Sequence, residues 1–230
     1  MNVNSLLSGN TSGTTGSGIG SGSSATQAAT SVNAASSLLL KAEQRVQSAL
    51  DATTAQLSKF GLLKSALVDG QAAAQALTQL PSTATPELVT SALGRFFKKF
   101  NAAVGAANVA ANSSTSTATT NSAKRVINDA KSALRSDPAV ADAMKKLGLT
   151  LQSDGSLLQD AKKFATSLAS DGAAVRSALA LVGKKMDAVN GKELATSGTV
   201  GSALTDLGQR NTALTAQQKA LKAFEQAASA

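Results

Sequence analysis

The chain has 230 residues and a formal charge of +8, and it contains neither cysteine nor histidine. Those two absences remove thiol nucleophiles, imidazole general bases and the commonest metal ligands, so we expect no enzymatic activity, no cofactor and no metal site. Aromatic residues make up only 3% of the chain, which favours long helices packed along their lengths over a bulky globular core.

The first part of the chain is uncharged as far as Lys41 and consists mainly of Ser, Thr, Gly, Asn and Ala. It lacks the basic front and the apolar block of a Sec signal peptide, and no stretch of the chain is apolar enough to predict a membrane span. Composition alone fits a simple flexible tail. We interpret residues 1–27 as a flexible export leader, and we expect the chain to leave the cell without cleavage.

A heptad pattern begins at residue 39 and predicts an N-terminal coiled-coil helix over residues 28–80. Two polar positions, Thr53 and Gln56, interrupt its apolar seam. Pro81 and Pro86 are expected to end the helix and begin a short connector. The seam positions on this helix are Leu39, Val46, Phe60 and Leu67.

Residues 81–192 are predicted to form a small helical domain. Its first helix, from Glu87 to Ala111, places three phenylalanines at helical spacing and is expected to lie in the core. A polar loop is predicted over residues 112–122, and Asp137-Pro138 is a favourable helix start. Further helices are predicted over residues 123–135, 138–147, 159–169 and 172–190.

A β-hairpin is predicted near residues 148–158, inside this otherwise helical domain. Apolar and polar residues alternate from Leu149 to Gln152, and Asp154-Gly155 follows, which is a typical turn pair. We expect Gly155 to adopt a positive φ angle, and we interpret Asp154 and Gly155 as a structural turn. The DGS sequence lacks the ligand series of a calcium loop, so it does not predict a metal site.

The chain ends in a second heptad pattern, which predicts a C-terminal coiled-coil helix over residues 193–230. The simplest way to bury its apolar stripe is against the N-terminal helix. The periodicity fits an ordinary helical bundle equally well. The seam positions on this helix are Val200, Leu207, Leu214 and Leu221. The predicted fold class is therefore mainly α, with long terminal coiled-coil helices flanking a small helical domain with one β-hairpin.

The order of these parts resembles the bacterial flagellar filament-capping protein family, the hook-associated cap proteins. The similar segments are GIGSG at 18–22, the heptad helix, the Phe96–Phe100–Asn101 pattern, and LGLTLQSDGSLLQD at 147–160. In that family the hairpin is a structural element between helices and carries no chemistry. Family members usually carry large β-rich domains where this chain has only PSTATPEL at 81–88, so the resemblance is to a minimal form.

The resemblance implies a secreted, extracellular structural protein of the flagellum that uses type III export and self-assembles. The implied partners are further copies of the chain, flagellin or hook–filament junction proteins, and an export chaperone. The net positive charge leaves an alternative open, a basic helical protein that coats an anionic polymer or surface. Nucleic acid is not an expected partner, because no aromatic stacking series or recognition motif accompanies the lysines.

Overall fold

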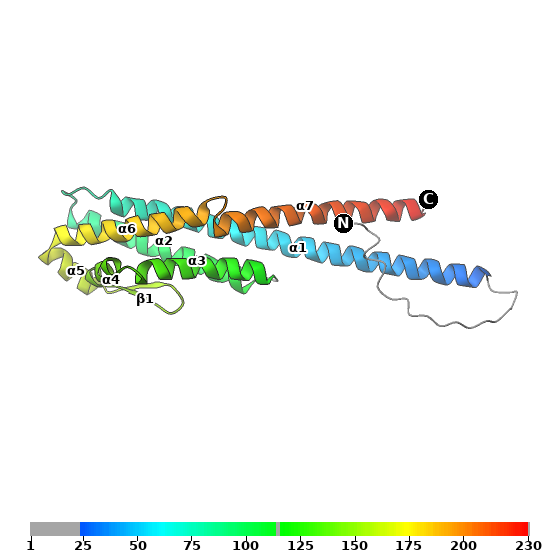
Figure 1. Cartoon of the computed structure of the whole chain (residues 1–230), viewed down its shortest axis with the longest axis horizontal. Helices are drawn as coiled ribbons and strands as arrows, with labels where there is room; N and C mark the ends of the chain where they lie inside the picture. The colour runs from blue at the N-terminus through cyan, green and yellow to red at the C-terminus, as the bar shows by residue number, and fades with distance from the viewer. Residues whose placement is uncertain (1–23, 114–115, 230) are drawn as a thin grey trace. The chain divides into compact units, whose positions relative to one another are not determined.

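The computed structural model describes residues 24–113 and 116–229, and within them the fold is mainly α with one two-stranded hairpin. This confirms the predicted fold class. Figure 1 shows the elements in chain order. They are α1 (Ser24–Thr78), α2 (Pro86–Asn112), α3 (Thr117–Arg135), α4 (Pro138–Lys146), β1 (Leu149–Leu151), β2 (Leu157–Gln159), α5 (Ala161–Ser170), α6 (Gly172–Leu194) and α7 (Thr199–Ser229).

The chain divides into two compact units between Glu43 and Gln44, so the long helix α1 belongs to both. Every buried side chain among the described residues belongs to the second unit. Most of the predicted leader, residues 1–27, lies outside the described residues. Its last four residues, 24–27, already belong to α1, which begins at Ser24 rather than at residue 28.

The first hydrophobic cluster joins the C-terminal end of α1 to α2, the second half of α3, α4, α5, α6 and the hairpin. Phe96 and Phe100 of α2 are buried in it, with ring centroids 5.9 Å apart. A fully buried side chain of this size stabilises a fold by roughly 1.5–3 kcal/mol. The prediction that the Phe-rich helix lies in the core is confirmed.

The second cluster joins the middle of α1 to the C-terminal end of α2, the first half of α3 and the start of α7. Alanine supplies much of its surface on α2, where Ala103, Ala107 and Ala110 are buried. Small side chains allow helices to approach closely, and this explains how a chain with so few aromatic residues fills its interior.

Side-chain caps mark several helix starts. Asp137 accepts a hydrogen bond from the backbone N–H of Ala139 at 3.1 Å, with Pro138 in the first turn, as the sequence predicts. Asp160 caps α5 through the N–H of Lys163 at 2.9 Å, and Asp171 caps α6 through the N–H of Ala174 at 2.9 Å. An N-cap of this kind stabilises a helix by about 1 kcal/mol.

The predicted polar loop over residues 112–122 is wrong in its second half, because α3 begins at Thr117. Threonine and asparagine have low helix propensity, which is why the sequence favoured a loop. Thr119 is nevertheless buried, and its hydroxyl donates a hydrogen bond to the carbonyl oxygen of Ser116 at 3.0 Å. Burial against neighbouring helices has overridden local propensity here. The C-terminal helix likewise begins at Thr199, since residues 193 and 194 still belong to α6.

The predicted hairpin is confirmed. Strands β1 and β2 pair antiparallel, with Leu151 opposite Leu157. Two hydrogen bonds close the loop between them. The N–H of Gln152 donates to the carbonyl oxygen of Ser156 at 2.8 Å, and the N–H of Gly155 donates to the carbonyl oxygen of Gln152 at 3.2 Å. Gly155 has a φ of 92°, as expected for the glycine of a three-residue hairpin loop.

Replacing Gly155 with valine is expected to destabilise the chain by about 1–3 kcal/mol, because a β-branched residue tolerates positive φ badly. A Cβ at this position would also lie 2.5 Å from Cγ2 of Ile127 in α3. Thermal unfolding followed by circular dichroism measures the loss. Gly105→Val is the matched control, since a Cβ at Gly105 would meet no atom within 4 Å. Unchanged stability with lost assembly would instead make the turn a binding surface.

Candidate functional site

The inner halves of the two predicted seams lie in one apolar cluster. Phe60 and Leu67 of α1 and Val200 and Leu207 of α7 are all buried there, each at 3% exposure or less. Residues of α2 and α3 complete the cluster. These four side chains are therefore covered within a single chain, and no neighbouring subunit is needed to bury them.

The outer parts of the seams are only partly covered. Val46 of α1 and Leu214 and Leu221 of α7 are half-buried, and Phe224 of α7 is 65% exposed. Leu39, the first predicted seam position, belongs to the first unit and is half-buried as well. The apolar stripe along α1 and α7 is therefore longer than the part that the chain itself buries.

Polar contacts hold α1 and α7 together along this outer part. The hydroxyl of Thr54 donates a hydrogen bond to Oδ1 of Asn211 at 3.4 Å. Farther along both helices, Nε2 of Gln218 donates a hydrogen bond to Oε1 of Gln47. Figure 1 shows α7 beside the corresponding part of α1. The pairing of the terminal helices, which the heptads suggested as the simplest arrangement, is present within unit 44–230.

The two polar positions in the first seam are buried. Thr53 is 3% exposed, and its hydroxyl donates a hydrogen bond to the carbonyl oxygen of Ala49 at 2.7 Å. Gln56 is 5% exposed. A buried polar group at a seam position reduces stability relative to an apolar one, and the hydroxyl of Thr53 is satisfied within its own helix.

Asn101 fastens the hairpin to α2. Its Nδ2 donates a hydrogen bond to the carbonyl oxygen of Leu157 at 3.0 Å, and its Oδ1 accepts one from the N–H of Leu157 at 2.8 Å. Nζ of Lys131 in α3 also donates a hydrogen bond to the carbonyl oxygen of Ser153 at 2.7 Å. The sequence identified Asn101 only as part of the Phe96–Phe100–Asn101 pattern. Its position directly after Phe100 was the available signal that it lies near the core.

Asp154 acts on its own turn. Its Oδ1 accepts hydrogen bonds from the backbone N–H of Ser156 at 2.9 Å and from the hydroxyl of the same residue at 2.7 Å. The backbone hydrogen bond, followed by that of the hydroxyl, holds the pKa of the Asp154 carboxyl below its usual value. Both predicted turn residues are thus accounted for by the geometry of the loop, without a ligand.

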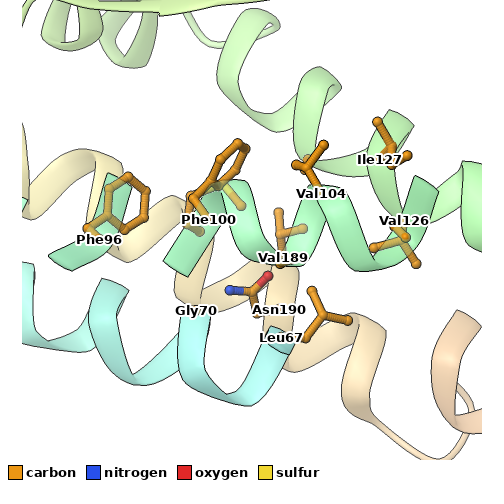
Figure 2. Close-up of a pocket in the computed structure, with 13 residues that line it drawn as sticks. Leu67, Gly70, Phe96, Phe100, Val104, Val126, Ile127, Val189 and Asn190 are labelled. Atoms are coloured by element: carbon orange, nitrogen blue, oxygen red, sulfur yellow. The ribbon is translucent and has the colours of Figure 1, made fainter. Parts of the chain in front are cut away.

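Figure 2 shows a small cavity between α1, α2, α3 and α6. Its volume is about 20 Å³, which is room for about one water molecule and far below the size of a ligand pocket. Of the described residues that line it, Asn190 alone has a polar side chain. The cavity therefore provides neither the space nor the groups for a substrate.

The described residues contain no group of three or more carboxylates that could hold a metal ion. None of the helices in the same part of the chain is both long and apolar enough to cross a membrane. Comparison with protein-family models, with curated proteins and with solved structures finds no match for this chain.

Proposed function

We propose that the chain is a secreted structural subunit of the bacterial flagellum, or of a flagellum-like filament, that assembles through its terminal helices. The observation that carries the proposal is the partly uncovered outer stripe of α1 and α7, which includes Leu214, Leu221 and the exposed Phe224. An apolar stripe left open along a helix pair is typical of a surface that other subunits cover. Further copies of the chain are the first partner we infer.

The resemblance to the filament-capping family supports the flagellar part of the proposal. An uncharged leader, a long heptad helix, a Phe–Asn helix, a hairpin and a terminal heptad helix follow one another in the family's order. Only residues 79–85 connect α1 to α2 here, where the family carries β-rich domains. In this account the chain is a minimal relative whose other partners are flagellin or hook–filament junction proteins and an export chaperone.

A test of the proposal is to shear the filaments from producing cells and to search the filament fraction and the culture supernatant for the chain by mass spectrometry. We expect the uncleaved chain, from Met1 onward, in the filament fraction. Leu221→Asp combined with Phe224→Asp should be exported but absent from filaments, because the added charges lie in the stripe. Ala216→Asp with Ala223→Asp adds the same charge at exposed positions of α7 and should still assemble.

Retention of the wild-type chain in the cytosol would contradict this function. A mature form that begins well inside the sequence would contradict uncleaved export.

A second candidate function, coating of an anionic polymer, is favoured by the distribution of charge. Residues 81–192 carry a net charge of +7 out of the total +8. The N–H of Asp160 donates a hydrogen bond to the carbonyl oxygen of Gly148 at 2.8 Å, and this contact brings two lysine pairs to the base of the hairpin. These exposed pairs are Lys145-Lys146 and Lys162-Lys163.

Retention on a heparin column at physiological salt distinguishes the two functions. Coating predicts strong retention that falls when Lys146, Lys162 and Lys163 are changed to Gln, with Lys184→Gln as the single-site control on α6. Elution of the wild-type chain at low salt would exclude the second candidate.

A further inference from the structure

The turn between α6 and α7, residues 195–198, leaves no room for additional atoms. A Cβ at Gly198 would lie 2.0 Å from the carbonyl oxygen of Lys192, and a Cβ at Gly201 would lie 2.0 Å from that of Ala195. The N–H of Gly198 donates a hydrogen bond to the carbonyl oxygen of Ala195 at 2.8 Å. The two helices are therefore joined by a closely packed turn, and a change at its base affects the start of α7.

Glu193, in the last turn of α6, has a carboxyl group buried at this junction. The residue is 0% exposed, and neither of its carboxyl oxygens has a hydrogen-bond partner in the described structure. An ionised carboxylate in such a place loses its hydration, which is unfavourable unless nearby donors compensate for the loss. A neutral carboxyl group avoids most of that cost.

The groups around Glu193 come from three helices. Asp129 of α3 carries a carboxylate, Lys192 is the neighbour of Glu193 on α6, and Thr199 of α7 contributes a hydroxyl. Nζ of Lys192 lies 3.7 Å from Oδ2 of Asp129, and because the Lys192 side chain is largely exposed, water screens its charge. On the side of α1, Gln71 presents a neutral amide toward Gly191.

These surroundings favour the protonated form of Glu193. Burial is the largest cause that raises the pKa of its carboxyl, and the neighbouring Asp129 carboxylate raises it further; Thr199 and Lys192 act in the opposite direction. A protonated Glu193 can donate toward Asp129, whereas an ionised one repels it across the contact of α3 with the junction.

We propose that a proton on Glu193 closes the junction between α6 and α7, and that losing this proton loosens the turn and the start of α7. In this proposal the buried carboxyl group of Glu193 binds a proton and not a metal ion. The inference concerns the folded chain by itself and does not depend on the filament function.

The raised pKa of Glu193 determines how the stability of the junction changes with pH. In the unfolded chain Glu193 titrates near its ordinary pKa, about 4.3. Because the folded value is higher, the proton's contribution to stability is complete below about pH 4 and is lost as the pH rises through the folded pKa. The junction is therefore expected to weaken from acidic toward neutral and alkaline pH.

The test compares the melting temperature of the full-length wild-type chain with that of Glu193→Gln across this pH range. Glutamine keeps the shape of the protonated side chain and does not titrate. We expect similar melting temperatures near pH 4, and a Gln variant that melts progressively higher than the wild type as the pH rises. Asp206→Asn, at an exposed position of α7, is the matched control and should keep a constant offset from the wild type.

Three further measurements test the proposal. In an Asp129→Asn background, the gain from Glu193→Gln should be smaller, because the repelling neighbour is gone. After correction for intrinsic rates, amide hydrogen exchange over residues 194–204 should accelerate with pH in the wild type but not in the Gln variant. An infrared band of a protonated carboxyl group that disappears in Glu193→Gln would support the proposal directly.

A constant difference in melting temperature between Glu193→Gln and the wild type at every pH would overturn the proposal. So would a Gln variant that is less stable throughout the range. A stability difference that appears only when calcium or magnesium is added, and vanishes with a chelator, would show that a cation occupies the site instead.

Discussion

Asp in place of Leu207 is expected to cost several kcal/mol of folding free energy, enough to unfold a marginally stable chain. Leu207 is 3% exposed and lies in the cluster that joins α1, α2, α3 and α7. Loss of a buried leucine alone costs about 2–5 kcal/mol, and an unpaired carboxylate adds its desolvation. Urea unfolding followed by circular dichroism measures the change.

Leu214→Asp is the matched control for this prediction, because the same substitution falls one heptad later on the same face of α7. Leu214 is only half-buried, so its replacement should cost about 1 kcal/mol or less. Equal losses at the two positions would contradict the division of the seam into an inner part that belongs to the core and an outer part that is open.

Gly183→Ala is expected to destabilise the chain by about 3 kcal/mol, the upper end of the usual cost of overpacking. The new methyl group would lie 2.5 Å from the carbonyl oxygen of Ala74 and 2.9 Å from Cβ of Leu77, where α6 crosses α1. A backbone carbonyl cannot rotate away as a flexible side chain can, so the helices themselves would have to separate. Thermal unfolding of the purified variant measures the loss.

The opposite effect, a gain in stability, is expected for Gly61→Ala on α1. A Cβ at Gly61 would meet no atom within 4 Å, so only the helix propensity changes, and alanine gains about 0.5–1 kcal/mol over glycine. If alanine stabilised the chain at both positions, the close approach of α1 and α6 at Gly183 would be wrong.

Local signals explain why much of the fold could be predicted from the sequence. Asp137-Pro138 caps and starts α4, and Asp154-Gly155 forms the hairpin loop; in both cases the conformation depends mainly on the residues themselves. The apolar face around Phe96 and Phe100 could be predicted because only one face of a helix can be buried against the core. These features needed no knowledge of distant neighbours.

Features that depend on distant contacts could not be predicted. Nothing near Glu193 in the sequence indicates that Asp129, more than sixty residues earlier, lies beside a buried carboxyl group. Leu207 and Leu214 occupy the same heptad position, but Leu207 belongs to the cluster that includes residues of α1, α2 and α3, whereas Leu214 lies outside it and is partly open. The sequence therefore predicted all eight seam residues as the assembly surface, although the chain itself buries half of them.

We propose that other subunits cover the outer stripe of α1 and α7. Light scattering of the purified full-length chain, from about 1 to about 100 µM, tests it most directly, since this range spans weak but specific association, about −6 to −8 kcal/mol. The account predicts oligomers that grow with concentration in the wild type and in Ala216→Asp with Ala223→Asp, and monomers in Leu221→Asp with Phe224→Asp. A wild-type chain that remains monomeric at the highest concentration would contradict self-assembly and make a stand-alone helical bundle the correct description.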